Sequence, residues 1–143
     1  MYKKVLFATD FDEISVNAAH KAKKIADENG ADLLLVHVVE PIPAYAYPGF
    51  AGFAEVEVSI REQAEKELNA LAKQLGVDEK HRLLEFGSIK NEILRIAKEQ
   101  KIDLIVTGSH GKHGLGLLLG STANAILHAS QCDMLIVQPQ PKA

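Results

Sequence analysis

The sequence has a single cysteine, no long hydrophobic segment and no block of one charge, and each shortage excludes a class of protein. Cys132 is the only cysteine among 143 residues, so no intramolecular disulfide can form, and a lone thiol fits a reducing compartment. No segment approaches the ~18 consecutive apolar residues of a membrane-spanning helix, and the apolar run after Lys4 is too short for a signal peptide. We therefore expect a cytoplasmic protein without a membrane partner.

The charges are nearly balanced, with 16 Lys plus Arg against 19 Asp plus Glu and a formal net charge of −3. Because general nucleic-acid binding depends on basic surface that neutralises phosphates, nucleic acid is not expected as a partner. A content of 47% hydrophobic residues supplies an ordinary core and excludes disorder. The length lies below the ~150-residue prior for one domain, so we expect a single domain over residues 1–143.

Short apolar, β-branched segments alternate with longer segments of helical periodicity, which is typical of βαβ units. The predicted strands cover residues 4–9, 32–39, 82–86, 103–107 and 133–137. Four helices are predicted between the strands from the spacing of apolar residues. The first runs from Ile14 to a stop at Asn29-Gly30, and the second from Val58 to a stop at Gly76. The third follows Ser88 as its N-cap, and the fourth covers 121–129. Five strands with right-handed crossovers predict an α/β fold, an open doubly wound parallel sheet with helices on both faces.

In such a sheet, ligands bind beyond the carboxyl ends of the strands, where neighbouring connections diverge to opposite faces. Asp10 follows the first strand and could accept a hydrogen bond from a ribose hydroxyl or hold a metal-bound water. A capping or turn role before the first helix explains this residue equally well. Val38 near the end of the second strand could form an apolar wall for a base, and core packing is the alternative.

The segment from Gly108 to Gly120 contains five glycines in thirteen residues, directly between a predicted strand and a helix. Glycine lets a ligand approach the backbone closely, so successive N–H groups can point at one anion. Ser121 and Thr122 stand where the next helix begins, and a helix start favours phosphate. The segment predicts a phosphate-binding loop without the spacing of a Walker A motif. A flexible loop whose glycines only permit turns is the alternative.

Other chemistry is poorly supported by the sequence. No spacing indicates a Ser-His-acid or Cys-His constellation, so we predict no catalytic residue. His110 and His113 have a metal-like i, i+3 spacing, but no Cys, Asp or Glu accompanies them in the loop, and we predict no metal site. Segment 41–53 holds three prolines and two glycines, which predicts a loop. Its aromatic side chains could form a lid or a partner-facing patch, but a long loop folded onto the protein's own surface is the commoner explanation.

Four blocks of sequence, in this order, resemble the universal stress protein (UspA) family: KVLFATD at 4–10, LLVHV at 34–38, DLIVTGSHG at 103–111 and GS at 120–121. The resemblance spans essentially the whole chain. It implies a five-stranded sheet with the strand order 3-2-1-4-5, a homodimer and a cytoplasmic stress-response role. In one branch of the family it also implies ATP bound without rapid turnover.

In that branch the resemblance places Asp10 at ribose or metal and Val38 at adenine. The full predicted nucleotide-binding set is Thr9, Asp10, Val38, Gly108, Gly111, Gly120, Ser121 and Thr122. The family pattern is similar to Gly-x-x-Gly, nine residues, then Gly-Ser/Thr, whereas eight residues separate Gly111 from Gly120 here. The loop therefore cannot wrap a triphosphate identically, and AMP or a cyclic nucleotide is an alternative to ATP, with Mg²⁺ as a possible companion.

These observations together predict a cytoplasmic stress protein that binds an adenine nucleotide and acts as a dimeric switch or adaptor for protein partners. The dimer would pair the last strand, residues 133–138, because an apolar strand at a sheet edge invites pairing. One alternative is a dimeric adaptor with a vestigial glycine loop. A slow ATPase or autokinase is another, for which Ser109, Ser121 and Thr122 offer hydroxyls but no general base is evident.

Overall fold

The computed structural model describes residues 1–11, 13–41, 52–108 and 121–138. Its strands are β1 (Lys4–Ala8), β2 (Asp32–Val39), β3 (Arg82–Phe86), β4 (Leu104–Gly108) and β5 (Asp133–Val137). Its helices are α1 (Glu13–Asn29), α2 (Phe53–Leu75), the 3₁₀ turn η3 (Glu79–His81), α3 (Ile89–Glu99) and α4 (Ser121–Ala129). All strand pairs are parallel, in the order β3-β2-β1-β4-β5. The predicted fold class and the implied strand order are both confirmed.

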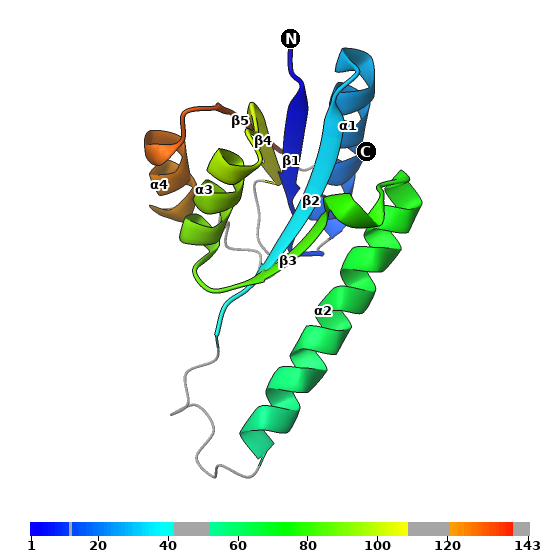
Figure 1. The fold of residues 1–143 in the computed structure, drawn as a ribbon, viewed down its shortest axis with the longest axis vertical. Helices are drawn as coiled ribbons and strands as arrows, with labels where there is room; N and C mark the ends of the chain where they lie inside the picture. Colours follow the sequence, from blue (N-terminus) through cyan, green and yellow to red (C-terminus); the bar gives the residue numbers. More distant parts are fainter. Residues whose placement is uncertain (12, 42–51, 109–120, 139–143) are drawn as a thin grey trace.

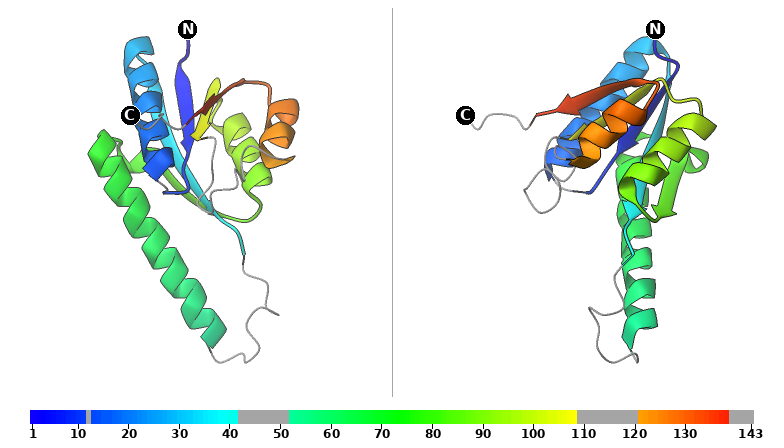
Figure 2. Two further views of the ribbon diagram at one scale, coloured as in Figure 1. Left: turned by 180° about the vertical axis from the view of Figure 1, so that it is seen from behind. Right: turned by 90° about the vertical axis from the view of Figure 1, so that its left-hand side faces the viewer.

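Helices cover both faces of the sheet, α1 and α2 on one side and α3 and α4 on the other (Figures 1 and 2). Successive strand residues alternate between the two cores: Phe7 and Leu35 pack toward α1 and α2, whereas Leu6 packs toward α3 and α4. Because both faces are buried, the central strands read as continuous apolar runs. The sheet's two faces are thus closed by helices, and its carboxyl edge is where the connections diverge.

Local signals explain where several helices end. Gly76 adopts a left-handed conformation (φ 69°) after the last residue of α2, as expected of a glycine C-cap. The hydroxyl of Ser88 accepts a hydrogen bond of 3.3 Å from the amide of Asn91, which confirms the predicted N-cap of α3. β1 ends one residue earlier than predicted, and β4 is shifted by one residue.

The start of α2 is the largest departure from the predicted elements. The helix begins at Phe53, whereas the sequence predicts a loop through that residue and core-facing periodicity only from Val58. Every buried residue described in α2 falls from Ala64 onward, so the first turns contribute no core signal. Figure 1 shows this amino-terminal half projecting beyond the carboxyl edge of the sheet. The turn η3 escapes prediction for the same reason, since it contains no buried residue.

Candidate functional site

The register of three adjacent strands brings predicted site residues to one edge of the sheet. Ala8 of β1 lies opposite Val36 of β2 and Thr107 of β4. Four residues of the predicted set follow within two positions of that level, namely Thr9, Asp10, Val38 and Gly108. These strands meet where β1 leads to α1 on one face and β4 leads toward α4 on the other, which is a topological switch point.

The turn after β1 is held by two hydroxyls. The amide of Thr9 donates a hydrogen bond of 2.9 Å to the carbonyl of Val36 and so extends the pairing of β1 with β2 by one residue. The Thr9 hydroxyl then accepts from the amide of Phe11 at 3.0 Å, and it lies 3.2 Å from the hydroxyl of Ser15 on α1. Ser15 in turn accepts from the amide of Asp10 at 3.4 Å. The two buried side chains, Thr9 and Ser15, therefore fix the backbone on both sides of Asp10.

Asp10 lies outside the first helix. α1 begins at Glu13, and Asp10 stands three residues before that first helical residue. The Asp10 side chain is half-buried at the carboxyl edge. The sequence left open a ligand role and a cap or turn role for Asp10; its place between β1 and α1 is that of a turn residue, and the ligand role stays a prediction.

Gly108 brings the end of β4 close to α1. A Cβ built on this buried glycine would lie 3.6 Å from the Cα of Ser15 and 3.9 Å from the Cβ of Ala18. An alanine would make ordinary contacts there, whereas a larger side chain would meet the backbone of α1. Gly108 thus places the end of β4 next to Ser15, which also bonds the turn around Asp10.

Val38 faces the opposite side of the sheet from that turn. It packs partly against the core formed with α3 and α4, on the same face as Val36. Gly111 and Gly120 lie outside the described residues, as do His110 and His113. Ser121 and Thr122 are the first two residues of α4, as predicted.

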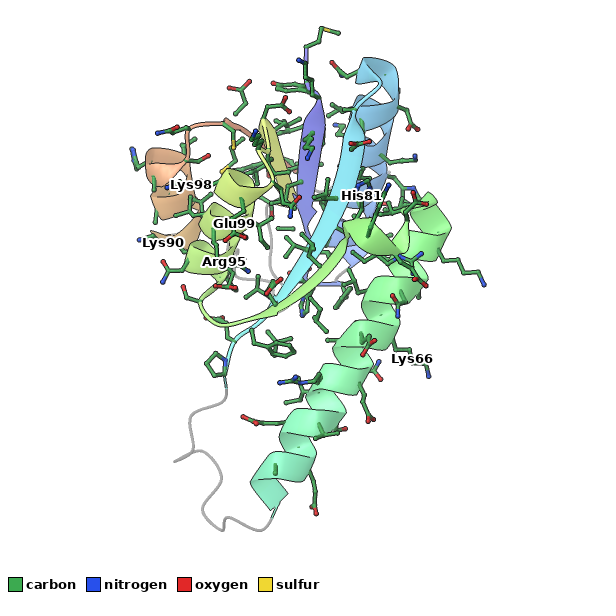
Figure 3. All side chains as sticks on the ribbon, viewed as in Figure 1. Lys66, His81, Lys90, Arg95, Lys98 and Glu99 are labelled. Atoms are coloured by element: carbon green, nitrogen blue, oxygen red, sulfur yellow. The ribbon has the colours of Figure 1, made fainter. Side chains whose placement is uncertain are left out.

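One cluster of charged side chains, on α3 and β3, is structural and does not form part of the site. Arg95 on α3 forms ion pairs with three carboxylates, and Figure 3 shows it beside one of them, Glu99. The other two are Glu85 at 3.1 Å and Glu92 at 2.9 Å. The hydrogen bond with Glu92 is the largest cause that raises the pKa of Arg95. All four side chains are partly exposed, so the network is a solvated set of charge pairs.

Two cavities lie at the other edge of the sheet. One of about 550 Å³ is bordered by the carboxyl ends of α3 and α4 and by Cys132, and one of about 510 Å³ by Tyr2, Asp103 and Asp133. They sit at the amino ends of the strands, whereas ligands of open parallel sheets bind at the carboxyl ends. The usual position of ligands in such sheets therefore favours the carboxyl edge, where Asp10 lies.

The described chain also limits other chemistry. Among its helices, none combines the length and apolar character that a membrane span requires. Within the same residues, no group of three or more His, Cys, Asp or Glu side chains is arranged to hold a metal ion.

Sequence reasoning missed two residues of this region. Ser15 bridges the turn to α1, but a serine on an amphipathic helix carries no distinguishing pattern. His37 donates to the carbonyl of Thr9 over 2.6 Å, and its ring lies 4.3 Å from that of Phe11. The signal for His37 was present, because it is the one polar residue between Leu33 and Val39 in an otherwise apolar run.

The chain is similar in sequence and in structure to proteins of one family. A sequence model of the universal stress protein family matches residues 1–138. Universal stress protein A homolog 2 of Coxiella burnetii is 42% identical over 139 residues, covering 96% of this chain and 95% of that protein. The solved structure of protein MJ0577 from Methanocaldococcus jannaschii superposes with a TM-score of 0.82 at 27% identity, covering 99% of both chains. A universal stress protein solved in complex with cAMP superposes with a TM-score of 0.62 at 29% identity, covering 95% of this chain and 96% of that one.

Proposed function

Because this chain belongs to the universal stress protein family, we propose that it is a cytoplasmic stress-response protein that binds an adenine nucleotide, with ATP as the first candidate. The bound state acts as a dimeric switch or adaptor that protein partners recognise. Turnover of the nucleotide is slow or absent, since no general base is evident beside the candidate hydroxyls. The related protein that was solved with cAMP supports the choice of an adenine nucleotide.

The observation that carries this proposal is the convergence of Asp10, Val38 and Gly108 at the carboxyl ends of three adjacent strands. In the proposed complex the Asp10 carboxylate accepts from the ribose hydroxyls, as acidic residues do in other open α/β nucleotide sites. Val38 forms part of an apolar wall for adenine. A base and a sugar at these positions direct the phosphates toward β4 and the start of α4.

The phosphates then rest on backbone amides of segment 108–111 and of residues 120–122. This segment combines glycine backbones with the beginning of α4, where unpaired N–H groups and the helix dipole favour an anion. The formal net charge of −3 gives no general attraction to polyanions, so local amides rather than surface charge must hold the phosphates. Mg²⁺ would be held chiefly by phosphate oxygens, with Asp10 as the protein's oxygen ligand.

Nucleotide released by heating the purified protein, identified by absorbance and mass, tests the proposal first. Calorimetry on stripped protein then compares ATP, ADP, AMP and cAMP, each with and without Mg²⁺. We expect binding of at least one of them, and the order of affinities reports how many phosphates the shortened glycine loop accommodates. If none binds at millimolar concentration, the nucleotide proposal is wrong, and a dimeric adaptor without a nucleotide takes its place.

A further inference from the structure

We propose that His37 is a positioning residue of the nucleotide site, which fixes the turn that carries the Asp10 carboxylate. The inference rests on the proposed function and concerns a residue that touches the turn rather than the nucleotide. Three observations carry it: a short hydrogen bond to the backbone, a ring contact with Phe11, and a cavity toward α2 that His37 and Phe11 both border.

The hydrogen bond defines the state of the imidazole. Nδ1 of His37 lies 2.6 Å from the carbonyl oxygen of Thr9, and since a carbonyl can only accept, Nδ1 carries the proton. Thr9 already uses its amide and its hydroxyl to join Val36 and Phe11. With the His37 bond, all three polar groups of Thr9 are engaged, and the peptide unit that leads directly into Asp10 is fixed in orientation.

The second contact holds the far side of the same turn. Phe11 has a left-handed backbone conformation (φ 68°), which is unfavourable for a non-glycine residue and needs compensation from its surroundings. Its ring lies 4.3 Å from that of His37 at an interplanar angle of 36°, and its amide donates to Thr9. His37 therefore contacts the residues immediately before and after Asp10.

Ordinary core packing does not explain this placement. On the side toward α2, His37 borders a cavity of about 350 Å³ whose other walls include Ser59, Gln63 and Glu67. The imidazole is half-buried rather than enclosed, and its contacts include those to Thr9 and Phe11 of the turn. On the adjacent position of the same strand, Val38 faces the opposite core. Strand β2 thus supplies the adenine wall and the support of the ribose carboxylate from two consecutive residues.

Two variants separate the donor from the ring. In His37→Asn, the amide Nδ2 stands the same number of bonds from Cα as Nδ1 and retains a donor, but the ring is lost. In His37→Phe, the ring is retained and the donor is lost. We expect ATP affinity to fall about tenfold in His37→Phe and at most about threefold in His37→Asn, as measured by calorimetry.

A double-mutant cycle with Asp10→Ala shows whether His37 acts through Asp10. If it does, adding His37→Phe to Asp10→Ala lowers the affinity by less than about twofold further. If His37 only stabilises the fold, His37→Phe lowers ATP affinity by the same factor in the wild type and in Asp10→Ala, and the melting temperatures fall together with the affinities. Equal affinity of His37→Phe and the wild type, or an additive cycle, overturns the inference.

Hydrogen exchange in unliganded protein gives a readout independent of nucleotide. The amides of Asp10 and Phe11 are bonded to the Ser15 and Thr9 hydroxyls, so loosening the turn must accelerate their exchange. We expect faster exchange in His37→Phe than in His37→Asn. If exchange at these amides is unchanged in His37→Phe, the positioning role is wrong and the proposed function is unaffected. If the wild type binds none of ATP, ADP, AMP and cAMP, the proposed function is wrong, and the positioning role falls with it.

Discussion

The hydroxyl of Tyr2 donates a hydrogen bond of 2.7 Å to the carboxylate of Asp133, which joins the start of the chain to the first residue of the edge strand β5. β4 lies between β1 and β5, and Asp103 just before it accepts from the amides of Lys3 and Lys4 at 2.8 and 3.0 Å. Side-chain carboxylates thus tie together the amino ends of three strands. At the carboxyl edge, by contrast, Asp10 is positioned by its backbone.

The first prediction concerns Tyr2 at alkaline pH. The hydrogen bond to Asp133 is the largest cause that raises the phenol's pKa above 10.0, followed by desolvation and by the charge of Asp133. A raised pKa in the folded state means that the bond stabilises the fold fully below pH 10.0 and that this contribution is lost as the pH rises through the folded value. The melting temperature of the wild type should exceed that of Tyr2→Phe at neutral pH, and this difference should vanish at high alkaline pH. A difference that grows with pH contradicts the assigned bond.

The second prediction concerns the end of α2. Gly76 has φ 69°, and nothing lies within 4 Å of a Cβ built there, so substitution changes backbone energy without a clash. We expect Gly76→Ala to lower the free energy of unfolding by about 1 kcal/mol. Gly76→Asn should cost less, because asparagine tolerates the left-handed region. Urea denaturation measures both, and equal losses in the two variants would contradict a conformational cause.

The accuracy of the sequence analysis differed between elements for physical reasons. Residues 32–39 were predicted without error because a strand buried on both faces is apolar throughout. The strand order came only through the family resemblance, since periodicity carries no information on neighbours. His37 was recognisable as the one polar residue in that apolar run, but its contact with Thr9 was not predicted, because a backbone carbonyl as partner leaves no pattern in the sequence. The start of α2 was missed because a projecting helix needs no apolar stripe.

The third prediction separates ligand binding from fold stability at Asp10. In the proposed complex, removal of its carboxylate loses a charge-assisted hydrogen bond, which costs about 1.5–3 kcal/mol, or roughly ten- to a hundredfold in affinity. Asp10→Ala should weaken ATP binding by that factor and reduce its dependence on Mg²⁺, while the melting temperature stays near that of the wild type. Asp10→Asn retains an acceptor and should lose less. A lower melting temperature with unchanged affinity would instead indicate a purely local structural role.

The fourth prediction concerns the glycine segment. Gly111→Val restricts φ and blocks close approach of the backbone to an anion, so nucleotide affinity should fall at least tenfold. Gly114→Val, outside the family pattern, is the matched control and should bind within about threefold of the wild type. AMP, ADP and ATP should be compared in both variants, because a phosphate contact affects the longer nucleotides most. Equal losses in Gly111→Val and Gly114→Val would indicate a flexible loop rather than a phosphate cradle.

The fifth prediction is a homodimer that pairs β5 with its two-fold mate. β5 is an edge strand, and its residues Met134, Leu135 and Ile136 remain half-buried rather than covered. An apolar edge with unpaired N–H and C=O groups is a template for pairing, and a symmetric partner covers both edges at once. Light scattering at micromolar concentration should therefore give twice the 15.6 kDa chain mass.

A matched pair of variants locates that interface. Ile136→Lys places a charge on the proposed pairing strand and should weaken the dimer at least tenfold, since an edge lysine opposes strand pairing. Phe86→Lys changes a residue that is 41% exposed on the opposite edge strand, β3, and should leave the mass unchanged. A monomeric wild type contradicts the dimer. Dissociation by Phe86→Lys but not by Ile136→Lys would keep the dimer and move its interface to β3, because only the strand that pairs between copies responds to a charge on its edge.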